Sequence, residues 1–404
     1  MNRVNELIKE YCPDGVPFQK VKDIYTRVKG TSITAGKMKE IACDDGEIRI
    51  FAGGKTIIDA HEKDIPKANI TRVPAVLVQS RGVIDVVYYD KPFTFKNEMW
   101  AYTSEDIVSV KFLYYVLKNS IQTFRDAASG MGSLPQISLK VTEEFMLPVP
   151  PLEVQREIVH ILDSFTLLTA ELTAELTARK KQYEYYRDNI LTFDTTIKHV
   201  RLGDICSVIT KGTTPKSYTK TGVSFVKTEA FDGSKIIPNK LSYVDEETHT
   251  TFLRRSMLEE NDILITIAGA TIGKCAIVPK EILPANTNQA LAIIRLAKGN
   301  CPKYVMYLLQ SDLMKRYMQK NIKGSAQPNL NLKQLNDFFI PLPPLNVQER
   351  LVRVLDNFEA ICTDLNIGLP AEIEARQKQY EYYRDLLLTF AEKGSTVLTD
   401  RQTD

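Results

Sequence analysis

Two glycine-containing stretches approach patterns that bind phosphate. GATIGKC, residues 269–275, has one residue too few between its glycines for a phosphate-binding loop, and Cys275 stands where Ser or Thr would bind magnesium. A strand–turn–strand hairpin is therefore the favoured interpretation. FAGGKT, residues 51–56, also predicts a turn, although Lys55 beside two glycines could meet a phosphate group.

The remaining candidates for catalysis are weaker. PLPPL, residues 341–345, shares only its prolines with the Asp/Asn-Pro-Pro-aromatic motif of amino-methyltransferases, because it lacks the acidic or amide residue and the aromatic ring. The sequence shows no adenosylmethionine-binding motif, no nuclease cluster and no Ser-His-Asp arrangement. We therefore predict a chain that is not an enzyme.

Polar and basic residues gather on loops between expected strands, in similar places of both halves. Arg, Asn and Gln side chains read base edges, whereas Lys, Ser, Thr and backbone amides near glycine hold phosphates. Any one of these residues alone is adequately explained as a solvated loop residue, and only the recurrence favours DNA binding. The candidate DNA-binding residues are Lys55, Ser80, Arg81, Lys211, Thr213, Thr214, Lys227, Thr228, Thr271, Lys274, Asn288, Gln289, Lys323, Ser325 and Gln327.

Composition limits the remaining possibilities. The 52 basic and 50 acidic residues exclude a strongly basic, histone-like binder but allow local basic faces. The six cysteines form no CxxC pair and the four histidines are dispersed, which predicts free thiols in a reducing cytosol and no metal site. No apolar run approaches the ~20 residues of a membrane span, so we expect a soluble, cytoplasmic protein without a membrane partner.

The elements that must position these loops are revealed by an internal repeat. Residues 147–165 match 340–358 without a gap, and 179–193 match 376–390. The second match contains KQYEYYRD twice, at 181–188 and 378–385. Between the matched segments the halves diverge almost completely. The chain thus reads as a globular part, a helix, a second globular part and a second helix.

Each matched segment predicts a long helix with a heptad seam. The spacing favours an intramolecular, antiparallel coiled coil of helices of about 40 residues, or about 60 Å, over two ordinary amphipathic core helices. The tyrosines of KQYEYYRD continue the seam, so Lys181, Arg187, Lys378 and Arg384 are expected to face solvent, a partner subunit or DNA backbone. The packing and docking residues are Val154, Ile158, Ile161, Phe165, Leu168, Leu172, Tyr183, Tyr186, Val347, Leu351, Val354, Phe358, Tyr380 and Tyr383.

Two local features adjust these helices. TAELTAEL, residues 169–176, repeats a four-residue unit, which interrupts the heptads as a stutter and adds about 6 Å of helix per unit. Such a unit can tune a spacing. The second helix carries four more residues here, and Gly368 and Pro370 are expected to bend it.

The fold class predicted is α+β, with two mixed α/β, strand-rich recognition domains separated by two long antiparallel coiled-coil helices of pseudo-two-fold symmetry. The expected boundaries are 1–146 for the first domain, 147–195 for the central helix, 196–339 for the second domain, and 340–404 for the distal helix and tail. Similar helices joined to dissimilar globular parts are what one scaffold carrying two recognition surfaces requires.

The chain resembles the specificity subunits of type I restriction–modification enzymes over nearly its whole length. The resemblance is carried by PPLxVQ at Pro150 and Pro343, the paired KQYEYYRD helix ends, DILITIAGATIGKCAIV and GSAQPNLNL; the TAEL spacer resembles the type IC group. In the first half, SRGVIDVVYYD replaces a GATIGK-like hairpin.

The resemblance implies a non-catalytic subunit whose two target recognition domains each read half of a bipartite, asymmetric sequence of double-stranded DNA. The helices then set the half-site spacing and dock the methylation subunits. It also implies two methylation subunits, which use S-adenosylmethionine, and restriction or translocase subunits, which use ATP and magnesium; no cofactor is expected on this chain. Two alternatives remain open, a stand-alone DNA methyltransferase or nuclease, and a coiled-coil adaptor that binds only protein.

Overall fold

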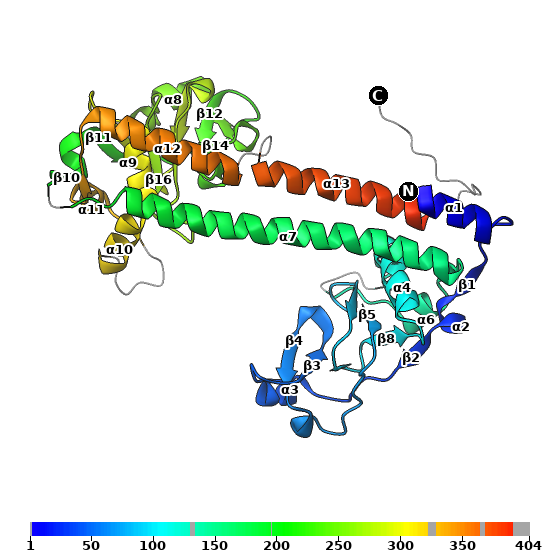
Figure 1. Ribbon diagram of the computed structural model, residues 1–404. Helices are drawn as coiled ribbons and strands as arrows, with labels where there is room; N and C mark the ends of the chain where they lie inside the picture. Colours follow the sequence, from blue (N-terminus) through cyan, green and yellow to red (C-terminus); the bar gives the residue numbers. More distant parts are fainter. Residues whose placement is uncertain (1, 130–133, 195, 322–328, 364–367, 391–404) are drawn as a thin grey trace. The chain divides into compact units, whose positions relative to one another are not determined.

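The computed structural model describes residues 2–129, 134–194, 196–321, 329–363 and 368–390. The chain divides into two compact units, 1–171 with 375–404, and 172–374 (Figure 1). The division passes through the long helices, whereas the predicted boundaries followed the helix ends. Each half of a long helix therefore belongs with the recognition domain on which it packs.

The first unit holds an antiparallel four-stranded sheet and a mixed three-stranded sheet. The larger sheet has the order β2 (Thr26–Val28), β8 (Trp100–Thr103), β5 (Ala75–Gln79), β6 (Asp85–Tyr89). The smaller has the order β4 (Ile57–Ala60), β3 (Ile48–Phe51), β7 (Phe93–Phe95), in which β3 and β7 are parallel. The other elements are α1 (Asn2–Tyr11), β1 (Phe18–Lys20), α2 (Val21–Ile24), α3 (Ala35–Ile41), α4 (Ile107–Asn119), α5 (Ile121–Asp126), α6 (Leu139–Glu143) and β9 (Met146–Pro148).

The second unit repeats this plan. Its larger sheet has the order β11 (Cys206–Lys211), β19 (Leu291–Leu296), β16 (Ile263–Thr266), β17 (Cys275–Ile277). Its smaller sheet has the order β15 (Ser242–Val244), β12 (Val223–Val226), β18 (Ala285–Thr287), with β12 and β18 parallel. The other elements include β10 (His199–Arg201), β13 (Phe231–Asp232), β14 (Lys235–Ile236), α8 (Glu246–Thr250), α9 (Pro302–Gln310), α10 (Asp312–Asn321), α11 (Leu332–Asn336) and β20 (Phe339–Pro341).

The two domains therefore share one topology although their sequences differ. Strands β5 and β16 are central in their sheets and buried along their whole length, which explains why AVLVQ and ILIT are almost uninterrupted apolar runs. Each unit also closes with a two-stranded ribbon, β1 with β9 and β10 with β20. The sequence divergence is thus compatible with a common scaffold.

The long helices begin after the paired prolines. α7 (Leu152–Ile190) has 39 residues, close to the predicted length, and the second helix is divided into α12 (Leu345–Thr363) and α13 (Gly368–Leu388). Gly368, which was predicted to bend this helix, is the first residue of α13 and has a φ of 76°, which is left-handed backbone. Leu365, predicted in the seam, lies outside the described residues.

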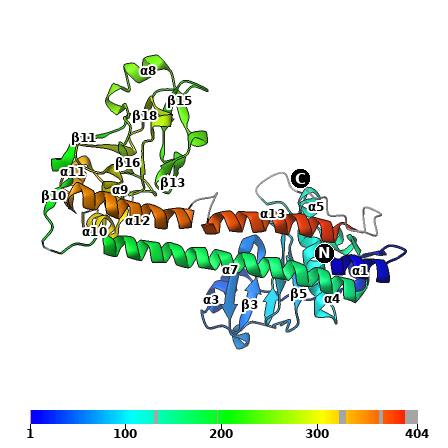
Figure 2. The ribbon, with the colours of Figure 1, turned by 45° about the horizontal axis from the view of Figure 1, so that its top comes forward.

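Within each unit, a segment of α7 lies beside the second helix of the repeat and runs antiparallel to it (Figures 1 and 2). In the first unit the Phe165 ring stacks on Tyr383, with centroids 5.5 Å apart. In the second unit the ring of Phe358 stacks on Tyr186 of α7, with centroids 6.0 Å apart. Helix α7 thus contributes the phenylalanine in the first unit and the tyrosine in the second. These reciprocal contacts are those of a pseudo-two-fold repeat, and the α+β prediction with antiparallel long helices is confirmed.

One expectation about the helix surfaces is wrong, and a second feature is the exposure of part of the seam. Arg187 was expected to face solvent, but it is only 6% exposed, bonds Asp188 at 3.1 Å and lies over the Tyr183 ring. Val354 and Phe358 of the predicted seam are 39% and 38% exposed, and Phe358 contacts the other long helix through Tyr186. The core of the second unit instead takes Val352 and Leu355, because α12 turns these positions toward α9.

Candidate DNA-binding edges and their supporting helices

The second domain gathers predicted residues from three chain segments at one sheet edge. Strands β12 and β18 are parallel and pair Val226 with Thr287, so the residues that follow both strands meet at the same edge. These are Lys227 with Thr228, and Asn288 with Gln289. The Thr213 amide donates to the Thr287 carbonyl at 2.9 Å, which brings the end of β11 to this edge as well.

Gly212 is required for that approach. A Cβ at this position would lie 2.1 Å from the Asn288 oxygen and 2.3 Å from the Thr287 oxygen, closer than any real contact. Its amide donates to the Leu291 carbonyl at 3.0 Å. The Gly212 and Thr213 amides are therefore occupied within the protein, contrary to the expectation that amides near glycine hold phosphates. The side chains of Lys211 and Thr214 are exposed and remain the candidate groups of this loop.

Lys227 is positioned by an aromatic ring. Its Nζ lies 3.8 Å from the centroid of Tyr218, which itself packs edge-on against Phe225 at 5.4 Å. Tyr218 itself is 43% exposed. The sequence prediction missed Tyr218, and the signal that could have found it is an aromatic residue among the polar residues of the 211–228 segment.

The GATIGKC segment is the turn of the β16–β17 hairpin, as predicted, and Thr271 and Lys274 lie on it. Thr266 at the end of β16 pairs with Leu291, so the turn extends from the same edge. Cys275 is buried, and burial raises the pKa of its thiol, which removes it from consideration as a nucleophile. Lys323, Ser325 and Gln327 lie outside the described residues.

The first domain has the equivalent edge in the same register. β3 and β7 are parallel and pair Phe51 with Phe95, and the Thr31 amide donates to the Phe95 carbonyl at 2.8 Å. Gly30 stands where Gly212 stands in the second domain, because a Cβ there would lie 2.3 Å from the Phe95 oxygen. The VKGTS and TKGTT segments thus make the same structure.

That equivalence identifies residues that the sequence prediction missed. Lys29 and Ser32 correspond to Lys211 and Thr214 and are exposed, and Lys96 follows β7 as Asn288 follows β18. Lys96 lies 3.1 Å from Glu98, so this edge carries an acidic side chain. VKDIYTRVKG, residues 21–30, resembles LGDICSVITKG, residues 202–212, and this similarity contained the signal for Lys29.

Two turns predicted to bind DNA in the first domain lie against each other. The β3–β4 turn contains Gly54, and a Cβ on Gly82 of the β5–β6 turn would lie 3.6 Å from the Gly54 Cα. FAGGKT is thus a turn, as predicted, and the Lys55 side chain lies outside the described residues. Arg81 is exposed on the β5–β6 turn. The prediction that Ser80 binds DNA is wrong, because this residue is 1% exposed and its hydroxyl donates to the Glu98 carbonyl.

The helices are tied to their domains by a repeated polar cluster. In the first unit Asp163 of α7 accepts hydrogen bonds from Lys111 and Tyr115 of α4, at 2.5 and 2.7 Å. In the second, Asp356 of α12 accepts from Lys303 and Tyr307 of α9, both at 2.6 Å. Burial is the largest cause that raises the pKa of both tyrosines, and the neighbouring carboxylates add to it. The tyrosines therefore act as neutral donors that hold each domain on its helix.

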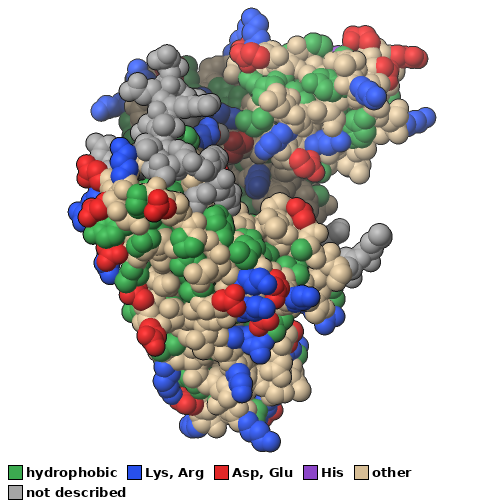
Figure 3. Space-filling model, turned by 90° about the vertical axis from the view of Figure 1, so that its right-hand side faces the viewer, with side chains coloured by type: hydrophobic (Ala, Val, Ile, Leu, Met, Phe, Trp, Pro, Cys, Tyr) green, Lys and Arg blue, Asp and Glu red, His purple; other side chains and the backbone are tan. Residues whose placement is uncertain are grey.

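Charge on the protein surface is mixed. On the face shown in Figure 3, Lys and Arg side chains intermingle with Asp and Glu. The ion pairs of the first domain show the same mixing: Lys20 and Lys22 bond Glu144 at 2.5 Å and hold its pKa at about 2. This face therefore offers paired charges to a ligand, unlike a continuous basic patch.

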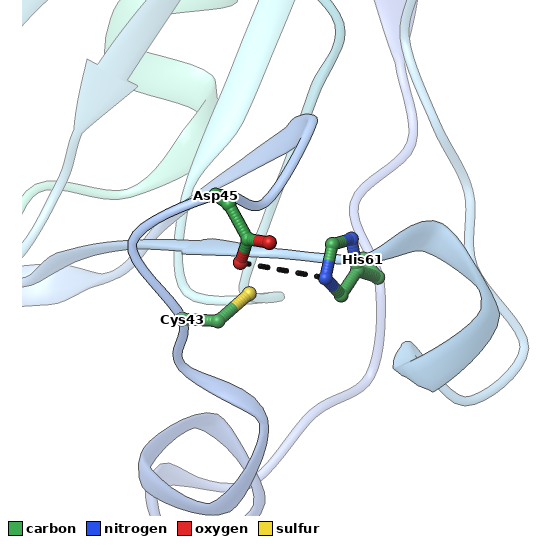
Figure 4. A group of neighbouring side chains, drawn as sticks. All are labelled: Cys43, Asp45 and His61. Atoms are coloured by element: carbon green, nitrogen blue, oxygen red, sulfur yellow. Dashed lines mark ion pairs between the residues drawn. The ribbon is translucent and has the colours of Figure 1, made fainter.

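One further group of ligand-type side chains lies in the first domain. Cys43, Asp45 and His61 bring their sulfur, oxygen and nitrogen atoms within 4.8 Å of one another (Figure 4). His61 also forms a hydrogen bond with Glu47, and this bond is the largest cause of the raised pKa of His61. Hydrogen bonds from the backbone and from His61 in turn hold the pKa of Glu47 at about 2. The sequence prediction missed this group because the β3–β4 hairpin separates its members along the chain.

Comparisons with known proteins agree with this architecture. Residues 13–179 and 195–375 match the family described as the type I restriction modification DNA specificity domain. The chain belongs to this family. It is 33% identical, over 70% of its length and 71% of the relative's, to the type I restriction enzyme EcoR124I/EcoR124II specificity subunit of Escherichia coli. A putative type I specificity subunit of Haemophilus influenzae is 33% identical over 74% of this chain and 77% of its own.

Solved structures show the same fold. The type I specificity subunit of M. genitalium superposes with a TM-score of 0.51 over 96% of this chain and 97% of its own, at 17% identity. A second solved chain, from a study of complex assembly and conformational transition of the type I system, superposes with a TM-score of 0.56. The match covers 94% of this chain and 97% of that chain, also at 17% identity. The protein is thus a non-catalytic DNA specificity subunit and part of a type I restriction–modification complex. Among the helices described, none is long and apolar enough to cross a membrane.

Proposed function

We propose that each recognition domain of this specificity subunit reads one half of a bipartite, asymmetric target in double-stranded DNA. The observation that carries the proposal is that two edges of identical topology present different side chains. The second edge offers Lys211, Lys227 and Asn288, whereas the first offers Lys29 and Lys96 at matching positions. A shared scaffold with different edges binds two DNA segments in the same manner and distinguishes their sequences.

The side chains divide between two tasks. Lysines and hydroxyl groups at the edges hold phosphates and set the register, and Asn288, Gln289 and Arg81 have the donors and acceptors to read base edges in the major groove. The contact of the Lys227 ammonium group with the Tyr218 ring restrains this side chain, which lowers the entropy lost when it binds a phosphate.

The long helices are proposed to dock two methylation subunits, which would bring S-adenosylmethionine to a flipped adenine. An uncovered seam on α12 supports this. In the first unit Val154 and Ile158 are fully buried, in a cluster that includes Val4 and Ile8 of α1. The equivalent positions of α12, Val347 and Leu351, are only half-buried. A partner helix is therefore expected to cover α12 as α1 covers the start of α7.

The charges beside this seam indicate the character of the partner helix. In the first unit Arg3 of α1 lies 3.5 Å from Glu157 of α7. The repeat places Arg350 where Glu157 stands and Arg353 where His160 stands, and both arginines are exposed. The covering helix is thus proposed to be amphipathic with acidic flanks. Restriction or translocase subunits, with ATP and magnesium, would complete the complex in the bacterial cytoplasm.

A domain exchange tests the proposal. Replacing residues 21–138 by the equivalent segment of another specificity subunit is expected to change one half-site only, read by mapping methylated adenines in DNA from cells that carry the whole system. The matched control replaces residues 202–331 and should change the other half-site. A change of both half-sites by either exchange, or no change, contradicts the proposal. Methyl transfer by the isolated chain would favour a stand-alone methyltransferase instead.

A further inference from the structure

Three side chains beside the β3–β4 hairpin have the chemistry and spacing of zinc ligands. Cys43 and Asp45 lie on the loop that precedes β3, and His61 directly follows β4. The Nε2 atom of His61 is 3.5 Å from Oδ1 of Asp45. Two ligands on one tetrahedral zinc lie about 3.3–3.7 Å apart, given bonds of about 2.0–2.3 Å. The three ligand atoms, all within 4.8 Å, need only small side-chain rotations to meet one ion.

The histidine ring is oriented by a second carboxylate. Nδ1 of His61 is 2.7 Å from Oε2 of Glu47, and the other Glu47 oxygen accepts the Glu62 amide at 2.9 Å. When Nδ1 carries the proton, the lone pair of Nε2 points toward Asp45 and Cys43. Metal-binding histidines recurrently donate their second ring nitrogen to a carboxylate, which fixes the tautomer.

The backbone brings both ligand segments together independently of any ion. Ile48 and Ala60 pair across the β3–β4 hairpin, and the Cys43 amide donates to the Asp59 carbonyl at 3.0 Å. Gly46 lies so close to the hairpin that a Cβ would be 2.2 Å from the Ala60 nitrogen. The loop is thus held against the strand end, and a metal would bind without a large rearrangement.

We propose that Cys43, Asp45 and His61 form a zinc site that ties the loop 43–47 to the end of β4. A thiolate, an imidazole and one carboxylate favour zinc over magnesium or calcium, which prefer oxygen ligands. Three protein ligands leave the fourth tetrahedral position to water. The site would stabilise the small hydrophobic cluster around Ile41, Ile48 and Ala60, which supports the first DNA-binding edge.

The test uses the full-length chain within its complex. Zinc is removed with a chelator, restored, and counted per complex by mass spectrometry after dialysis, for the wild type and for Cys43→Ser and His61→Gln. The proposal expects each variant to lose one zinc per specificity subunit. Glu47→Gln should keep the ion but weaken its affinity about 10–100-fold. Cobalt in place of zinc should give a thiolate charge-transfer band that Cys43→Ser abolishes.

Matched controls are Cys301→Ser and His199→Gln, which change the same residue types in the second unit and should leave the zinc content unchanged. Circular dichroism in the presence of chelator establishes that all variants fold. Equal zinc content in the wild type and both ligand variants overturns the proposal, and so does a wild type that takes up no zinc. In either case His61 only bridges the carboxylates of Glu47 and Asp45.

Discussion

Val354 and Leu355 are neighbours on α12, but Val354 is exposed and Leu355 is buried. Substituting each residue in turn separates an effect on folding from an effect on assembly. Leu355 is fully buried in the core of the second unit. Leu355→Ala removes its side chain beyond Cβ and leaves a cavity, which costs about 2–5 kcal/mol. For a unit of roughly 200 residues, each kcal/mol lowers Tm by about 2–4 °C, so the expected fall is about 4–20 °C.

Val354 is 39% exposed, so Val354→Ala should cost only about 1 kcal/mol, the transfer energy of two partly covered methyl groups at about 0.8 kcal/mol each. Its proposed role lies in docking. Val354→Asp would place a charge in a covered interface, and a loss of about 1.4 kcal/mol or more weakens binding of the methylation subunit at least tenfold. Folding of the isolated unit should change little.

The assays are thermal unfolding of the specificity subunit and titration calorimetry with the methylation subunits at low temperature. Leu355→Ala should unfold early yet assemble with nearly normal affinity below its transition. Val354→Asp should unfold near the wild type and assemble poorly. The reasoning is refuted if Val354→Asp loses as much stability as Leu355→Ala, or if it binds the methylation subunits as tightly as the wild type.

Three further predictions concern the spacer, the second edge and pH. A third TAEL unit inserted after residues 173–176 adds about 6 Å of helix, so adenine mapping should show half-sites about one to two base pairs further apart; an unchanged gap counts against the spacer role. Lys227→Ala should weaken DNA binding and reduce the salt slope of log K by about 1, whereas an unaltered slope means that no phosphate contact is lost. Glu144→Gln removes a carboxylate whose pKa is lowered from 4.5 to about 2 by Lys20 and Lys22. The contribution of this carboxylate to the free energy of unfolding is therefore present above pH 4.5 and disappears as pH falls toward 2. Urea unfolding of both proteins should therefore differ at neutral pH and converge in acid, and a difference that persists near pH 2 contradicts the assignment.

The sequence repeat was sufficient to predict the scaffold. Matching spacing of apolar residues in two segments predicted long antiparallel helices, and Gly368 marked the region where the second helix is divided. It could not show which of two apolar stripes faces the domain. Val354 and Leu355 are both apolar, and only the position of α9 decides that Leu355 is buried.

The candidate edges were only partly predictable. Lys211, Lys227 and Asn288 were identified individually as loop residues, but their proximity depends on the parallel pairing of β12 with β18. Ser80 was misassigned because a serine beside Arg81 and Gly82 suits a binding loop, whereas the fold turns its hydroxyl toward the Glu98 carbonyl. Cys43 and His61 meet only because β3 and β4 form a hairpin.

The placement of the edges explains how the recognition domains can diverge while the scaffold persists. At each edge the fixed element is a glycine, Gly30 or Gly212, whose position no other residue could take without collision with the neighbouring strand. The residues beside it, Lys29 and Lys211 among them, point away from the core and are exposed. Substituting them removes no buried contact and so costs little stability, and under the proposed function it would change the surface that meets DNA. Specificity can therefore change at the strand ends while the helices and the polar cluster that hold the domains remain as they are.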